Sequence, residues 1–241
     1  MKSSQIPRIN KAIFDKDYCS RFDTNEGLAY FRKFSLWFIK QKAKEIYQQL
    51  NGTSGKIVEI GSGPGYLLLE LSKILPSKYT FYGVDIDEGM LEFAQKHTRR
   101  NAEKIRFIRN GSYSLPFKDN SVSMVISENS MHHWDQLNEM LKEILRILTP
   151  GGTIIIFDFD SESKWYAFTV SIISHLLWMR KIAYKSFGKY FYTYYVSLLR
   201  AYSKKELSVA LNDIACSTYE METKRMTLKL RITKPSISAP N

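Results

Sequence analysis

Cysteine is scarce in this chain: its 241 residues include two, Cys19 and Cys216. Because they lie far apart in the sequence, no disulfide framework is expected, and we predict a reduced, cytoplasmic setting. The histidines and cysteines follow no zinc-binding spacing, so no metal site is predicted. The sequence also lacks a P-loop, which excludes that class of phosphate-binding site.

Long apolar runs are missing as well. The longest, residues 167–179, contains Ser171, Ser174 and His175 and is too short to span a membrane. The first residues lack the apolar core of a secretory signal, so no such signal is expected. The chain is nevertheless 44% hydrophobic, which suffices for the buried core of one α/β domain.

The net charge of +11 is concentrated in one segment. Residues 161–205 hold eight lysines or arginines, one acid and twelve of the 33 aromatic residues. Such a segment can contact nucleic acid, an anionic lipid surface or an acidic substrate. It can equally be a helical cap with solvated lysines and a packed aromatic face, and the composition does not decide between these.

Glycine is not abundant, yet three of the twelve glycines, Gly61, Gly63 and Gly65, alternate directly after an apolar β-branched run. A helical pattern follows, and then a second apolar run that ends in Asp85, 20 positions beyond the third glycine. Strand, glycine turn, helix, strand and acid form the frame of a nucleoside-cofactor site. Asp85 is placed to accept hydrogen bonds from both ribose hydroxyls.

The glycine spacing separates two kinds of cofactor. A dinucleotide fingerprint has its third glycine where this chain has Tyr66, so pyrophosphate binding is disfavoured. Glu59 is a carboxylate in an otherwise apolar strand, and it needs donors such as a ligand ammonium or backbone N–H groups. A nucleoside that carries an amino acid therefore fits these groups better than NAD does.

The sequence Val58-Glu-Ile-Gly-Ser-Gly-Pro-Gly-Tyr-Leu resembles the first signature of the class I S-adenosylmethionine-dependent methyltransferases. Later motifs follow in the order and spacing of that family over roughly residues 55–160. They are Gly83-Val-Asp-Ile-Asp, Ser114-Leu-Pro-Phe, Val125-Ile-Ser-Glu-Asn and Leu148-Thr-Pro-Gly-Gly-Thr-Ile-Ile-Ile-Phe. The resemblance is greatest to the small-molecule branch that includes quinone-biosynthesis methyltransferases. It implies an enzyme that uses S-adenosyl-L-methionine to methylate O, C or S of a small, aromatic or apolar acceptor.

The resemblance also implies which residues hold the cofactor. Ile86 is expected to pack on adenine, and backbone carbonyls at the end of the fourth strand are expected to hold the methionine amino group. The expected cofactor-binding residues are Glu59, Gly61, Ser62, Gly63, Gly65, Asp85, Ile86, Asn110, Gly111, Ser112, Glu128 and Asn129.

Two positions depart from the family pattern. Relatives commonly place an aspartate four residues before Leu-Pro-Phe to hold the adenine amino group, and this chain has Gly111 there. Asn110 or Ser112 would then supply the acceptor. A second usual acid is replaced by Ser123. These departures motivate one alternative, a non-catalytic scaffold that keeps the cofactor fold.

His132 and His133 follow the fourth strand and are candidate general bases, because histidine titrates near neutral pH. The alternative is that they start the next helix and pack on the sheet.

Tyr18, Trp165 and Tyr194 are candidate substrate-binding residues, although each could also be core or surface. The family's Asn-Pro-Pro-aromatic motif for methylating amines of bases is absent, as is the cysteine cluster of the arsenic-methylating type.

The elements predict an α/β fold with a doubly wound, mostly parallel seven-stranded sheet. Strands are expected at 56–60, 79–84, 105–109, 122–127, 153–158, 217–222 and 227–233, and helices at 27–50, 66–75, 87–97, 136–148, 163–182, 188–201 and 204–211. We expect one methyltransferase domain with an N-terminal helical segment (1–52), a cofactor-binding core (53–160), a helical cap inserted after strand five (161–202) and a C-terminal helix and strand pair (203–235).

The cap leaves two further alternatives open. An RNA or protein methyltransferase would grip its polymer with the basic aromatic segment, although a small-molecule acceptor is favoured. Peripheral membrane contact through the same segment is also possible. The sequence gives no indication of oligomeric state.

Overall fold

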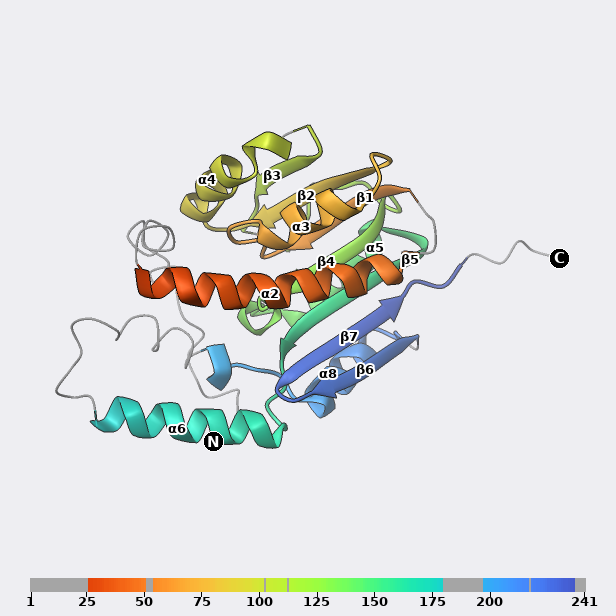
Figure 1. The fold of residues 1–241 in the computed structure, drawn as a ribbon. Coiled ribbons are helices and arrows are strands. Elements are labelled where there is room, and N and C mark those ends of the chain that lie inside the picture. Colours follow the sequence, from red (N-terminus) through yellow and green to blue (C-terminus); the bar gives the residue numbers. More distant parts are fainter. Residues whose placement is uncertain are drawn as a thin grey trace.

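A computed structural model describes residues 26–50, 54–101, 103–111, 113–179, 197–216 and 218–236. Its strands form one seven-stranded sheet in the order β3-β2-β1-β4-β5-β7-β6 (Figure 1). The strands are β1 (Gly55–Ile60), β2 (Tyr79–Asp85), β3 (Ile105–Arg109), β4 (Val122–Glu128), β5 (Leu148–Phe159), β6 (Tyr219–Lys224) and β7 (Thr227–Thr233). The first five are parallel, and β7 runs antiparallel between β5 and β6. The predicted mostly parallel sheet is confirmed.

Helices lie between β1 and β2, β2 and β3, and β4 and β5, as the sequence pattern predicted. They are α2 (Glu26–Gln48), α3 (Tyr66–Ile74), α4 (Glu88–His97), α5 (Leu137–Ile147), α6 (Lys164–Met179) and α8 (Lys204–Asp213), with short 3₁₀ turns η3 (Arg99–Asn101) and η4 (Met131–His133). α6 follows β5, where the sequence predicted a helical cap. The second predicted cap helix, 188–201, falls largely outside the described residues.

The central strands of the sheet are buried on both faces, because their apolar residues form continuous runs. On β5, Ile154 and Ile156 pack in one hydrophobic cluster with residues of α5 and α8. Ile155 and Phe157 face the other way and pack with residues of α2 and α3. Side chains in a strand point to opposite faces in turn, so a continuous apolar run is what a doubly covered sheet requires.

β5 begins earlier than the sequence predicted. The expected strand was 153–158, but Leu148 already pairs with Val122 of β4. Pro150 and Gly151 argued against a strand here, since both residue types are unfavourable in strand interiors. The structure accommodates them with a register shift between Val122 and Met124 and with positive φ (76°) at Gly151.

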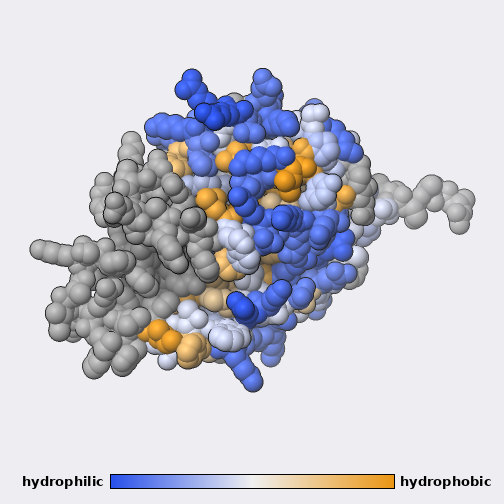
Figure 2. Space-filling model, viewed as in Figure 1, coloured by the Kyte–Doolittle hydropathy of each residue, from blue (hydrophilic) through white to orange (hydrophobic). Residues whose placement is uncertain are grey.

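Several of the exposed large apolar side chains lie on α2 and α6. On α2 these are Trp37 and Phe38, and on α6 they are Trp165, Phe168 and Ile172. In the view of Figure 2, hydrophilic residues cover much of the described surface, and hydrophobic ones appear in small groups. Across the described ranges, no helix combines the length and apolar character needed to cross a membrane.

Replacing Ile155 by Ala should destabilise the protein by about 2–5 kcal/mol, because the fully buried side chain fills the space between β5 and the helices above it. Denaturant unfolding monitored by circular dichroism measures this change. The matched control is Val209→Ala on the exposed side of α8, which should change the free energy of unfolding by no more than about 0.5 kcal/mol. Equal effects of the two substitutions would contradict the assigned core.

Candidate functional site

The loop between β1 and α3 is built from backbone conformations that favour glycine. Gly61, Gly63 and Gly65 have φ values of 69°, 48° and 73°, in the left-handed region. The loop is tied to the neighbouring strand, because the N–H groups of Gly61 and Ser62 both donate to the carbonyl of Val84. The chain therefore turns sharply at the carboxyl end of β1 and enters α3.

The three glycines have different surroundings. A Cβ atom on Gly61 would lie 1.9 Å from Ser130 Oγ, and one on Gly65 would lie 2.8 Å from the Phe107 ring. A Cβ on Gly63 would meet no described atom within 4 Å. Gly61 and Gly65 therefore permit internal packing, whereas Gly63 borders open space where a ligand can approach the backbone.

Asp85 is fixed beside this open position. Its carboxylate accepts hydrogen bonds from the backbone N–H of Gly63 at 2.7 Å and of Asp87 at 2.9 Å. Burial raises the pKa of Asp85 above its ordinary value, and these backbone donors counteract part of that effect. Asp87 itself caps α4 by accepting from the N–H of Met90.

Three carboxylates gather on one face of the sheet at the carboxyl ends of adjacent strands. Asp85 ends β2, Glu59 lies near the end of β1, and Glu128 ends β4. In the register of the sheet, Glu59 pairs with Gly83 and Ile126, which lie two residues before the other two acids. Because side chains alternate, all three acids point to the face that α2 and α3 cover.

Glu59 is the most deeply buried of the three acids. Its side chain is 3% exposed, and Oε2 has no hydrogen-bond partner among the described residues. Burial raises the pKa of Glu59 well above its ordinary range, and the charges of Glu128 and Asp85 raise it further. The Leu68 N–H and the Lys42 ammonium act in the opposite direction. Glu59 is thus a buried acceptor that a ligand donor would complete.

The end of β4 is organised around Glu128. Lys42 of α2 and the side-chain amide of Asn129 both donate to Glu128 Oε1, at 2.5 and 2.8 Å. Asn129 has positive φ (51°), and its N–H donates to the carbonyl of Phe157 on β5. The sequence singled out Glu128 and Asn129 but not Lys42, which lies in an ordinary polar helix pattern.

An exposed apolar surface lies next to Asp85. The Ile86 side chain is 44% exposed, and a Cβ on Gly111 would lie 2.8 Å from Ile86 Cγ1. Glycine at 111 therefore leaves room for the isoleucine that would face a ring. Asn110 is held next to this surface, because its N–H donates to the Asp85 carbonyl and its side-chain amide donates to the Ser114 carbonyl.

His132 forms a buried pair with an aspartate that the sequence analysis did not identify. His132 Nδ1 lies 2.7 Å from Asp158 Oδ1, and the His132 backbone N–H donates to Oδ2 at 3.0 Å. Burial disfavours the Asp158 carboxylate, but contacts with His132 and with the Phe159 N–H outweigh it and lower the pKa of Asp158. On the ring's other side, Nε2 of His132 is buried and has no partner among the described residues.

This arrangement fixes the tautomer of His132. When the ring is neutral, a carboxylate beside Nδ1 favours the proton on that nitrogen and leaves the lone pair on Nε2. The geometry is that of a histidine oriented by an acid, which can accept a proton at Nε2.

His133 differs from its neighbour. Burial, the adjacent His132 and the nearby Arg200 lower the pKa of His133 to about 3, so it is neutral near pH 7. Its Nδ1 lies 3.3 Å from Arg200 Nη1. The structure therefore separates the two histidine candidates, because an acid orients His132 while a cation contacts His133.

Of the three predicted substrate residues, Trp165 alone lies in the described part of the chain. Trp165 lies in the first turn of α6 and is 59% exposed. Tyr18, Tyr194 and the predicted cofactor residue Ser112 lie outside the described residues.

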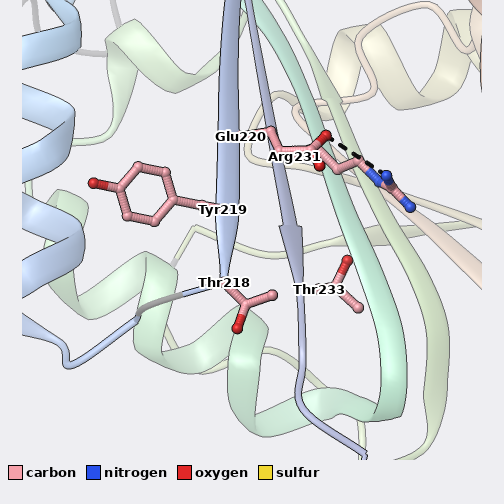
Figure 3. Close-up of a pocket in the computed structure, with 5 residues that line it drawn as sticks. All are labelled: Thr218, Tyr219, Glu220, Arg231 and Thr233. Carbon is pink, nitrogen blue, oxygen red and sulfur yellow. Dashed lines mark ion pairs between the residues drawn. The ribbon is translucent and has the colours of Figure 1, made fainter.

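A small cleft of about 210 Å³ lies elsewhere, on β6 and β7 (Figure 3). It is lined by Thr218, Tyr219, Glu220, Arg231 and Thr233. Thr233 pairs with Thr153 at the amino-terminal part of β5, so this cleft lies away from the carboxyl ends where the acids gather. Within the described ranges, no group of three or more His, Cys, Asp or Glu side chains is arranged to hold a metal ion.

Comparison with known proteins agrees with this geometry. The sequence pattern of a protein family described as "Methyltransferase domain" matches residues 58–156. The ubiquinone/menaquinone biosynthesis C-methyltransferase of Wigglesworthia glossinidia brevipalpis is 26% identical over 88% of this chain and 85% of its own length. The demethylmenaquinone methyltransferase of Lactococcus lactis is 27% identical, over 58% of this chain and about half (54%) of that relative.

The fold also has known counterparts. A putative S-adenosyl-L-methionine-dependent methyltransferase of Methanococcus maripaludis superposes with a TM-score of 0.67 at 20% identity. The superposition covers 98% of this chain and all of that one. At this identity, the likeness concerns the fold.

Replacing Glu59 by Gln should stabilise the ligand-free protein by roughly 1–2 kcal/mol at about pH 8, because it removes a buried charge without changing the side-chain volume. Because the folded state raises the pKa of Glu59, the native protein loses stability as pH rises above the ordinary glutamate pKa of about 4.3. The gain from Glu59→Gln should therefore be larger at about pH 8 than at about pH 5.

Thermal and denaturant unfolding at the two pH values measure this difference. Glu92→Gln on the exposed side of α4 is the control and should show no such dependence. A Glu59→Gln variant that is less stable than the native protein at both pH values would contradict the assignment of Glu59 as an acid buried at the expense of stability.

Proposed function

We propose that this chain is a class I S-adenosylmethionine-dependent methyltransferase and that it methylates O, C or S of a small, aromatic or apolar acceptor. The observation that carries the proposal is the open backbone at Gly63, which is hydrogen-bonded to the fixed carboxylate of Asp85, together with the carboxylate oxygen of Glu59 that has no described partner. These groups fit a sugar hydroxyl pair and an ammonium, respectively. S-adenosyl-L-methionine carries both.

The order of the strands supports one direction for the cofactor across the sheet. β3, β2, β1 and β4 are consecutive neighbours. Adenine would lie toward β3, against Ile86 and beside Asn110 and Gly111, and the ribose would lie at Asp85. The amino acid end would then reach β1 and β4, where Glu59 and Glu128 lie. Gly61, Ser62, Gly65 and Asn129 would complete the contacts at the loop and the end of β4.

When bound, S-adenosyl-L-methionine supplies a methyl carbon already activated by a positively charged sulfur. The chain's own residues then have a limited task, which is to hold the acceptor in line with that carbon and to exclude water. A base is needed only where the acceptor atom arrives with a proton.

His132 is the base we propose for such an acceptor. Asp158 holds the proton on Nδ1, so Nε2 is oriented to accept one from a phenol, an enol or a thiol. Asp158 acts through His132 and is a positioning residue. His133 is proposed to line the site as a neutral ring, because its pKa of about 3 leaves it uncharged at neutral pH.

The relatives named above support an acceptor of the quinone-precursor kind, since one is named for ubiquinone and menaquinone biosynthesis and another for methylating demethylmenaquinone. Trp165, Tyr18 and Tyr194 remain the proposed substrate-binding residues, with Trp165 exposed on α6. An RNA or protein methyltransferase and a non-catalytic scaffold are the competing functions, and no contact among the described residues favours either.

Binding of S-adenosyl-L-methionine and of its demethylated product, measured by isothermal titration calorimetry, tests the cofactor site. Asp85→Asn should weaken both affinities about 10- to 100-fold, because it removes a charged acceptor worth about 1.5–3 kcal/mol. Glu88→Gln, at an exposed acid just beyond it, should leave both affinities unchanged. A native protein that binds neither compound would overturn the proposed function.

His132→Gln should lower turnover about 100-fold or more near pH 7 with a hydroquinone, catechol or thiol acceptor, and less at high pH, where the acceptor loses its own proton. Asp158→Asn should act in the same direction, since it removes the partner of Nδ1. Formation of S-adenosylhomocysteine over about pH 6–9 is the readout. His133→Gln is the comparison, with a smaller effect expected. Unchanged turnover of the His132 variant near pH 7 would exclude the base.

A further inference from the structure

Lys42 lies in the site without having been predicted there. It projects from α2, the helix that lies across one face of the sheet (Figure 1). Its Nζ is 2.5 Å from Glu128 Oε1 and 5.3 Å from the centre of the Phe157 ring. The Lys42 side chain is 14% exposed. A lysine head group is rarely buried to this extent unless it is paired.

The position of Lys42 is firmly set by its helix. Ala43 and Ile46 of α2 are buried in the cluster that includes strand residues of β1, β4 and β5. Glu45 of the same helix forms an ion pair with Lys229 of β7. Because α2 is packed in this way, the helix itself holds Lys42 next to the end of β4.

The charges around Lys42 suggest what it is for. Glu59, Asp85 and Glu128 suit the ammonium of an amino acid, but they would repel its carboxylate. The positive charge of Lys42 lowers the pKa of Glu59, so Lys42 acts on this group of three acids. An ammonium has three donors, so Lys42 can hold Glu128 and a second acceptor together.

We propose that Lys42 binds the α-carboxylate of the amino acid moiety of the cofactor, while Glu59 and the end of β4 take its ammonium. This inference rests on the proposed function, since it requires the cofactor at the glycine loop. It makes α2 part of the binding site. The ion pair with Glu128 would then serve to aim Lys42 before the ligand arrives.

The test is a cycle of two ligands and two proteins, read by calorimetric affinity and not by turnover. The ligands are S-adenosylhomocysteine and its decarboxylated analogue, which differ only in the carboxylate. The native protein should bind the complete ligand about 10-fold more tightly or better, since a hydrogen bond to a charged group contributes about 1.5–3 kcal/mol. In Lys42→Gln, this preference should fall to about 2-fold or less, because the partner of the carboxylate is gone.

Two further variants control for charge and for folding. Lys44→Gln changes an exposed lysine on the same helix and should keep the full preference. Lys42→Arg keeps the positive charge and should keep a preference of several-fold. Thermal unfolding of each variant checks that α2 remains packed.

Each outcome has one meaning. A native protein that binds both ligands equally overturns the role of Lys42, even if the Lys42→Gln variant does not fold. Equal loss of both ligands in Lys42→Gln also overturns it, because Lys42 would then only anchor α2. A native protein that binds neither ligand rejects the proposed function instead.

Discussion

The site depends on a conflict that the fold imposes on its carboxylates. A parallel sheet covered on both faces excludes water from the strands, so an acid on a strand is disfavoured unless it is matched by donors. This chain places Asp85, Glu59 and Glu128 on one such face, at the ends of three adjacent strands. Asp85 is matched by backbone N–H groups and Glu128 by Lys42, while one oxygen of Glu59 has no described partner. The burial that disfavours the Glu59 carboxylate therefore also leaves it as an acceptor for a ligand.

Much of this could be predicted from local sequence patterns. The glycines at 61, 63 and 65, the acid at 85 and the β-branched runs identify the strands and the loop, because backbone conformation and side-chain alternation act over a few residues. The predicted start of β5 at residue 153 was wrong. Pro150 and Gly151 are unfavourable residues inside a strand, but pairing with the neighbouring β4 overrides that preference.

Partners that are distant in sequence were not predictable in the same way. Asp158 lies 26 residues from His132, and Lys42 lies 86 residues from Glu128. An acid after an apolar strand and a lysine on a helix are common features. Their roles here depend on the residues they contact, His132 and Glu128, which are far away in the sequence. The acid after Phe157 was a usable signal for the first pair, because a charge ending a buried strand needs a partner. Nothing in the helix pattern signalled the second.

The strand order also has a consequence for synthesis of the chain. β7 lies between β5 and β6, so the outer edge of β5 is covered by a segment made long after it. Until Thr227–Thr233 leaves the ribosome, a nascent chain with a finished cofactor loop still presents the unpaired edge of an apolar strand. Such edges recruit other chains. Truncated or stalled products should therefore aggregate or require chaperones, even though every residue at the glycine loop is already present.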